Sequence, residues 1–171
     1  MKNLILIGMP GVGKSTVGVV LAKKMGYRFL DSDLIIQEQT GKVLHQLIDA
    51  YGIEGFWELE NKVNLSIDAE KTIIATGGSA IYGAAAMERF CDRDIVIYLK
   101  LSYEELKGRL GDLAKRGVTM NEGQTLKDLY DERIPLYEKY AKITISCDKK
   151  QIRDIVDEIE KEVCNETDEM E

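Results

Sequence analysis

Short runs of apolar residues alternate along the chain with longer segments in which apolar residues recur at helical spacing. The runs predicted to be strands are residues 4–7, 27–30, 71–75, 95–99 and 143–146. The segments predicted to be helices are residues 15–25, 34–51 with an interruption near Gly41, 53–69, 84–90, 102–109, 125–140 and 151–163. Strands that alternate with helices are typical of a parallel sheet with helices on both faces. The pattern predicts a three-layer α/β/α fold around a five-stranded parallel sheet.

The first predicted strand and helix carry the clearest signals. Residues 4–7 form a continuous apolar run closed by Gly8, which suits a strand buried on both faces. In the helix that follows, the apolar residues share one face, and Gly26 is a typical helix stop.

Two features are predicted to interrupt regular structure. Residues 111–124 contain three glycines, mixed charge and few apolar residues, which predicts a mobile loop. Pro135 lies inside the helix predicted over 125–140 and should kink or break it. We expect a single domain over residues 1–164, followed by an acidic, solvated tail over 165–171.

Composition limits the classes of protein that the chain can represent. It has 171 residues, 44% apolar and 31% charged, which is the balance of a globular domain. No stretch approaches the roughly 18 apolar residues that a membrane span needs. The net charge of −7 disfavours a nucleic-acid groove but leaves room for a local basic pocket. We expect a cytoplasmic monomer without a nucleic-acid or membrane partner.

The cysteines and the histidine offer little chemistry. Cys91, Cys147 and Cys164 are widely spaced and contain no Cys-x-x-Cys pair, which favours buried or incidental thiols over a disulfide or a zinc site. His45 is the only histidine, so mechanisms that need two are excluded. Its neighbours predict a place on a helix surface.

A glycine-rich motif lies between the first strand and the first helix. Residues 8–15 match G-x-x-x-x-G-K-[ST] at every fixed position. The glycines let backbone N–H groups turn toward phosphate oxygens, and the helix N-terminus adds a partial positive charge. Lys14 would contact the β- and γ-phosphates, and the Ser15 hydroxyl can bind Mg²⁺. The nucleotide-binding residues predicted from this P-loop are Gly11, Val12, Gly13, Lys14, Ser15 and Thr16.

A P-loop alone does not define a reaction, because GTPases, motor ATPases and small-molecule kinases all contain one. The nearest match to the guanine-reading motif Asn-Lys-x-Asp is residues 61–64, which lack the aspartate and lie within a predicted helix. Large ATPases usually need a longer chain. A compact P-loop chain with a mobile loop favours a small-molecule or nucleotide kinase, with a fold like that of nucleoside monophosphate kinases.

Two carboxylates follow the second predicted strand. Asp31 and Asp33 would lie at the carboxyl edge of the sheet, where the P-loop also lies. Carboxylates there can hold Mg²⁺, orient an acceptor hydroxyl or take its proton. The alternative is a turn with a helix N-cap, a position at which Asp is favoured. The neighbouring P-loop favours the functional interpretation.

Over roughly residues 3–160 the chain resembles the shikimate kinase family. The matching motifs occur in the family's order: the P-loop, Phe29-x-Asp31-x-Asp33, the stretch at Phe56, Gly77-Gly78, Arg116 and Arg133-x-Pro135-x-Tyr137. The resemblance implies transfer of the γ-phosphoryl group of ATP to a hydroxyl of shikimate, with Mg²⁺ as cofactor, in aromatic amino acid biosynthesis.

The resemblance also implies roles on the nucleotide side. Ser15 and Asp31 would serve Mg²⁺, Asp31 through water. Arg109 would lie near the adenine. Arg116 would close over the phosphates and stabilise the transferring phosphoryl group, so that Lys14 and Arg116 both act in catalysis.

On the acceptor side, the resemblance makes Asp33 the residue that binds the hydroxyl and acts as general base. Gly77 and Gly78 would bring backbone N–H groups close to the substrate. Arg133 would pair with the substrate carboxylate, a task suited to a planar guanidinium group.

Three positions depart from the family's pattern. Trp57 stands where the family has an arginine that contacts the carboxylate, Ser79 replaces a third glycine, and Gly117 replaces a usual proline. Losing a charged hydrogen bond in a buried site costs roughly 1.5–3 kcal/mol. We interpret Trp57 as a residue that lines the substrate pocket. Three alternatives to shikimate kinase chemistry stay open. Two are kinases with another acceptor, either a small hydroxy acid or polyol, or a nucleoside or nucleotide. The third is a nucleotide-binding module without catalysis.

Overall fold

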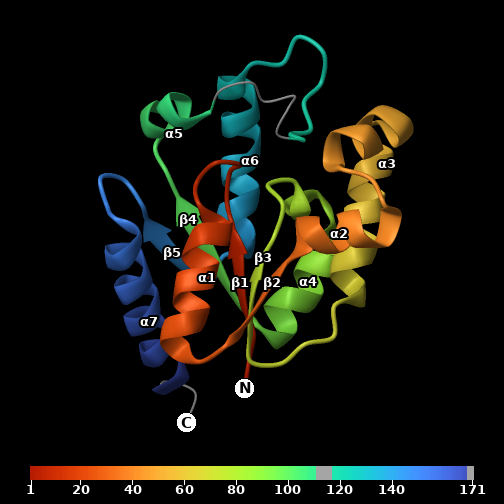
Figure 1. The fold of residues 1–171 in the computed structure, drawn as a ribbon. Helices are drawn as coiled ribbons and strands as arrows, with labels where there is room; N and C mark the ends of the chain where they lie inside the picture. Colours follow the sequence, from red (N-terminus) through yellow and green to blue (C-terminus); the bar gives the residue numbers. More distant parts are fainter. Residues whose placement is uncertain (111–116, 169–171) are drawn as a thin grey trace.

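A five-stranded sheet forms the centre of the structure, a computed structural model that describes residues 1–110 and 117–168. The strand order is β2-β3-β1-β4-β5, and each neighbouring pair is parallel (Figure 1). The strands are β1 (Leu4–Ile7), β2 (Arg28–Asp31), β3 (Thr72–Ala75), β4 (Ile95–Lys100) and β5 (Ile143–Ser146). The sheet predicted from the sequence is confirmed.

Helices cover both faces of this sheet. They are α1 (Lys14–Met25), α2 (Ser32–Thr40), α3 (Leu44–Ser66), α4 (Ala84–Arg93), α5 (Tyr103–Arg109), α6 (Leu126–Tyr140), α7 (Ile152–Asp168) and the short 3₁₀ helix η1 (Ala80–Tyr82). Helices α1 and α7 pack together on one face, whereas α4 contacts α3 and α6 on the other (Figure 1). The three-layer α/β/α arrangement is confirmed.

The central strands are buried on both faces, as their continuous apolar runs predict. Every residue of β1 and β3 is buried, whereas the edge strand β5 alternates between buried and exposed positions. Strands covered by helices on both sides need apolar residues at every position. At Gly18, α1 lies so close to the sheet that a β-carbon would be 2.6 Å from the Phe29 ring. The loop between β1 and α1 is therefore followed by a helix that packs tightly against the sheet.

Glycines end or interrupt helices where the sequence predicts. Gly26 and Gly41 follow α1 and α2 in the left-handed conformation, with φ of 67° and 68°. Gly52, with φ of 73°, divides α3 at the boundary expected between two predicted helices. Helix α2 begins at Ser32, two positions before the predicted start, because Asp31 caps it.

Helix α6 differs from the prediction at Pro135. The helix continues through this proline from Leu126 to Tyr140, so the break is absent, whereas the kink, the other predicted outcome, stays a prediction. Arg133 and Tyr137, on either side of the proline, are each only 1% exposed, and the Tyr137 hydroxyl donates to the Gly78 carbonyl at 2.6 Å. This packing outweighs the loss of one backbone hydrogen bond at the proline.

The remaining expectations concern the surface. His45 is exposed on α3, the free thiols of Cys91 and Cys164 are exposed, and that of Cys147 is buried. Helix α7 continues to Asp168, into the segment expected to be an acidic tail. Within residues 1–110 and 117–168, no helix combines the length and the apolar character that crossing a bilayer requires.

Candidate active site

A cavity of about 390 Å³ opens at the carboxyl edge of the sheet, a size typical of small-ligand sites. P-loop residues form one part of its wall: Pro10, Gly11, Gly13, Lys14, Ser15 and Thr16. Residues from five other segments form the rest: Asp33, Leu44, Phe56, Glu60, Thr76, Gly77, Gly78, Ser79, Gly117, Val118, Thr119 and Arg133. The structure thus brings most of the predicted P-loop residues to one cavity with four predicted acceptor residues: Asp33, Gly77, Gly78 and Arg133.

The P-loop wraps around the Lys14 ammonium group. Gly8, Gly11 and Gly13 have φ of 150°, 81° and 101°, which glycine adopts more readily than other residues. The Lys14 Nζ donates to the carbonyl oxygens of Gly8 at 2.7 Å and Met9 at 2.9 Å. The first turn of α1 contains no acidic residue, so its free N–H groups favour an anion.

Burial lowers the pKa of Lys14 to about 8, although Asp33 opposes this shift. The side chain is almost fully buried, so it presents its charge in a region of low effective dielectric. Lys14 and Asp33 line the same cavity and influence each other's pKa, which the topology at this sheet edge predicts.

Asp31 serves two partners at the end of β2. Its Oδ1 accepts from the backbone N–H of Asp33 at 3.0 Å, which caps α2, and its Oδ2 accepts from the Ser15 hydroxyl at 2.6 Å. The helix cap is therefore confirmed, and the role of Asp31 toward Mg²⁺ stays a prediction. The oxygen atoms of Ser15 and Asp31 are the ligands that Mg²⁺ prefers.

The Asp33 carboxylate faces the cavity from the first turn of α2. Its Oδ1 is buried and has no hydrogen-bond partner within the described part of the chain. Burial and the neighbouring Asp31 raise the pKa of Asp33 to about 6, with Lys14 acting in the opposite direction. The group is ionised at neutral pH and can accept a proton there.

Gly77 and Gly78 are required by close approach. A β-carbon on Gly77 would lie 2.4 Å from Glu60 Oε2 and 2.7 Å from Asp33 Oδ1. A β-carbon on Gly78 would lie 2.7 Å from Pro10 Cδ. Only glycine lets two carboxyl oxygens and the P-loop come this close to the backbone.

Glu60 is a site residue that we did not predict from the sequence. This side chain on α3 is 1% exposed, its Oε1 accepts from the Ser79 hydroxyl at 2.7 Å, and its Oε2 is buried without a partner in the described chain. Burial, together with Asp33, raises the pKa of Glu60 to about 8. Its spacing from Phe56 and Val63 places an acidic residue on the buried face of the helix, which is the signal that could have revealed it.

Arg133 on α6 lies beside Gly78, where a β-carbon would be 3.1 Å from its Nη1. Its Nη2 donates to the backbone carbonyl of Thr119 at 3.1 Å and to the Thr119 hydroxyl at 2.9 Å. Its Nε is buried and has no partner among the described residues. A buried guanidinium group with an unused N–H points to an anionic ligand.

Trp57 does not belong to the described cavity wall, although we expected it to line the pocket. Its ring stacks on Tyr82 with centroids 3.9 Å apart, and its Nε1–H donates to the Thr119 hydroxyl at 3.1 Å. Thr119 lies between this indole and the cavity. The sequence pattern could not show this, because the contact joins residues far apart in the chain.

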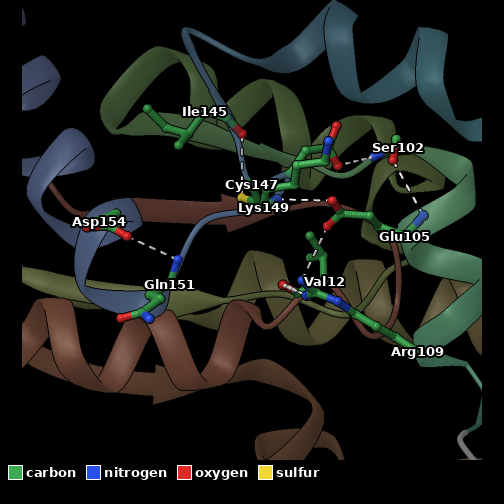
Figure 2. Close-up of polar contacts among 10 residues, drawn as sticks. Val12, Ser102, Glu105, Arg109, Ile145, Cys147, Lys149, Gln151 and Asp154 are labelled. Carbon is green, nitrogen blue, oxygen red and sulfur yellow. Dashed lines mark hydrogen bonds and ion pairs between the residues drawn. The ribbon is translucent and has the colours of Figure 1, made fainter.

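Arg109 lies against the outside of the P-loop (Figure 2). Its Nη1 donates to the Val12 carbonyl at 3.4 Å and its Nη2 is 3.8 Å from Glu105 Oε2. Ser102 Oγ accepts from the Glu105 N–H and caps α5, and Glu105 Oε1 accepts from the Lys149 N–H. Glu105 thus joins α5 to the loop before α7. Arg116 lies outside the described residues, and its role stays a prediction.

A P-loop lysine and a buried carboxylate that share a cavity with a buried arginine define a P-loop kinase that acts on a small molecule. The family model for shikimate kinase matches residues 10–164. The chain therefore belongs to the shikimate kinase family.

Individual relatives agree with this assignment. A shikimate kinase of Vibrio vulnificus strain YJ016 is 36% identical over 163 residues, which cover 94% of this chain and 95% of the relative. The structure of shikimate kinase from Acinetobacter baumannii in complex with shikimate is 33% identical, with a TM-score of 0.89 and coverage of 97% and 94%. A gluconokinase from Sinorhizobium meliloti, at 16% identity and a TM-score of 0.54, shares the fold alone.

Proposed function

We propose that this protein transfers the γ-phosphoryl group of ATP to a hydroxyl group of shikimate. One observation carries the proposal: Lys14, Asp33 and the buried guanidinium group of Arg133 line a single cavity. Membership of the shikimate kinase family supports shikimate as the acceptor. The nucleotide would enter at the P-loop, and the acceptor would lie between Asp33 and Arg133.

The nucleotide side would bind the phosphates of ATP through the backbone N–H groups of residues 11–16 and the charge of Lys14. Ser15 and Asp31 would hold Mg²⁺, because their oxygen atoms are close together and suit this ion. When bound, Mg²⁺ neutralises charge on the phosphates. Arg109 would lie beside the adenine, since it contacts the outer surface of the P-loop.

The acceptor side would orient one hydroxyl group and take its proton. As the hydroxyl oxygen forms its bond to the γ-phosphorus, the bond from that phosphorus to the ADP oxygen breaks. The hydroxyl proton passes to Asp33, whose Oδ1 has no partner in the described chain. Arg133 would bind the substrate carboxylate, and the backbone N–H groups of Gly77 and Gly78 would approach the substrate because no side chain intervenes.

The proposed enzyme works as a monomer in the cytoplasm, with small molecules as its only ligands. The net charge of −7 supports the proposal that nucleic acid is not a partner. Light scattering after size-exclusion chromatography of the full chain tests the monomer, and a mass of twice 19.3 kDa would contradict it.

The decisive experiment is ADP release from ATP and Mg²⁺ by the full chain, measured with shikimate, quinate, gluconate, homoserine and nucleosides in turn. We expect acceleration by shikimate alone, and no acceleration in the Lys14→Ala variant. Acceleration by gluconate or another panel member instead would assign a different acceptor. Tight ATP binding without acceleration by any of them would identify a nucleotide-binding module.

A further inference from the structure

We propose that the Thr119 hydroxyl donates a hydrogen bond to the substrate carboxylate, and that Trp57 positions this hydroxyl from behind the cavity wall. The inference rests on the proposed function and names a specificity residue for it. It concerns described side chains only, on α3, on α6 and in the segment before α6.

The donors around the Thr119 hydroxyl fix the direction of its proton. A threonine hydroxyl has one proton and two acceptor lone pairs, whereas tryptophan and arginine side chains can only donate. Trp57 Nε1 donates to Thr119 Oγ1 at 3.1 Å and Arg133 Nη2 donates to the same oxygen at 2.9 Å. Both lone pairs are therefore occupied, and the proton is left to donate in the remaining tetrahedral direction.

No acceptor for this proton exists in the part of the chain that the structure describes. Every hydrogen bond of Thr119 there is one that it accepts, at its hydroxyl from Trp57 and Arg133 and at its carbonyl from Arg133. Thr119 is only 2% exposed, yet it lines the cavity. A buried donor without a partner carries a desolvation cost, which a ligand oxygen would remove.

The surroundings select a carboxylate as the partner. The guanidinium group of Arg133 contacts Thr119 and has a buried Nε without a described partner, so this end of the cavity favours negative charge. The carboxyl groups of Asp33 and Glu60 converge on Gly77, where the negative charge of Asp33 disfavours an anion. A hydroxyl that accepts from a cation is also a stronger donor, because hydrogen bonds in a chain polarise one another.

Trp57 acts on the substrate only through Thr119. Its ring is fixed by the stack on Tyr82, whose ring also lies 5.5 Å from the Arg133 guanidinium carbon. The segment that carries Thr119 is also held at Gly117. This glycine packs so closely against α3 that a β-carbon on it would lie 2.7 Å from the Cβ of Leu44. Trp57 is therefore a positioning residue, and Thr119 is the residue that contacts substrate.

The test measures KM for shikimate, KM for ATP and kcat in Thr119→Val, Thr119→Ser and Trp57→Phe. Valine keeps the shape of threonine but has no hydroxyl, so we expect KM for shikimate to rise about tenfold, with KM for ATP and kcat within twofold. Serine keeps the hydroxyl and should stay within about threefold of the wild type. Phenylalanine keeps the stack on Tyr82 but loses the N–H, and should raise KM for shikimate about threefold.

Two further comparisons separate this mechanism from a general loss of packing. Trp57→Phe should have no additional effect in the Thr119→Val background, because its only route to the substrate is then gone. The methyl ester of shikimate is neutral, so Thr119→Val should weaken its binding by only about threefold or less. This is measured as KM when the ester is a substrate, or as its inhibition constant when it is a competitive inhibitor. Additive effects in the double variant would overturn the role of Trp57.

The wild type measured in the same assay separates this inference from the proposed function. An active wild type with an unchanged KM for shikimate in Thr119→Val would overturn the inference and leave the function intact. A wild type that does not phosphorylate shikimate would overturn both. Circular dichroism confirms folding of each variant, and Thr119→Ala replaces Thr119→Val if the valine variant does not fold.

Discussion

Replacing Glu60 with glutamine should make the stability of this protein much less dependent on pH. The folded structure raises the pKa of Glu60 from 4.5 to about 8 by burying it beside Asp33. Between these two values the folded protein keeps a proton that the unfolded chain has released. Stability that Glu60 contributes is therefore complete below the unfolded pKa and is lost as the pH rises toward the folded pKa.

The magnitude follows from the size of this shift. Linkage predicts that Glu60 alone removes about 4 kcal/mol of unfolding free energy between about pH 5 and about pH 8.5. Glutamine is almost the same size, keeps an oxygen to accept from Ser79 Oγ, and does not titrate. Glu60→Gln should therefore resemble the wild type at the lower pH and be several kcal/mol more stable at the higher one.

Urea denaturation of both proteins at the two pH values measures this effect, because groups that titrate in both proteins largely cancel in the comparison. Glu58→Gln is the matched control, since Glu58 is exposed on the same helix and its replacement should leave the pH dependence unchanged. A difference between wild type and Glu60→Gln that is equal at both pH values would refute the reasoning.

Three other substitutions test the site directly. Asp33→Asn should abolish ADP release with shikimate while the circular dichroism spectrum is retained; substantial residual transfer would exclude Asp33 as the base. Gly78→Ala should cost about 1–3 kcal/mol in thermal unfolding and raise KM for shikimate, because its β-carbon would meet Pro10. Gly108→Ala, with open space around it inside α5, should not destabilise the protein and should leave KM unchanged. Arg116→Ala should lower kcat at least about a hundredfold with little change in ATP affinity by titration calorimetry, and normal turnover would contradict the predicted role.

The sequence predicts the fold well because the signals that define it are local. The apolar run of β1, the glycines of the P-loop and the glycine at position 26 each act on neighbouring residues. The exception is Pro135, where a local rule predicts a kink or a break and the burial of Arg133 and Tyr137 prevents the break. Packing between distant segments decides that case.

The sequence predicts only those site residues that belong to a recognisable motif. Lys14 and Asp33 were expected to face each other, because both follow strands that end at the same edge of the sheet. Glu60 and Thr119 were not expected, since their roles depend on contacts across 19 and 62 positions of sequence, with Ser79 and Trp57 respectively. Trp57 itself was expected at the pocket, and the structure places Thr119 between Trp57 and the cavity.

The backbone at Ser79 has a consequence for how this acceptor site can vary. Its φ of −94° and ψ of 5° suit any amino acid, whereas Gly77 and Gly78 have no room for a side chain. Position 79 is thus the one place in this turn where a substitution can alter the proton affinity of Glu60 without rebuilding the turn. In this chain the Ser79 hydroxyl makes that adjustment, because its hydrogen bond to Glu60 Oε1 acts against the rise in pKa that burial causes.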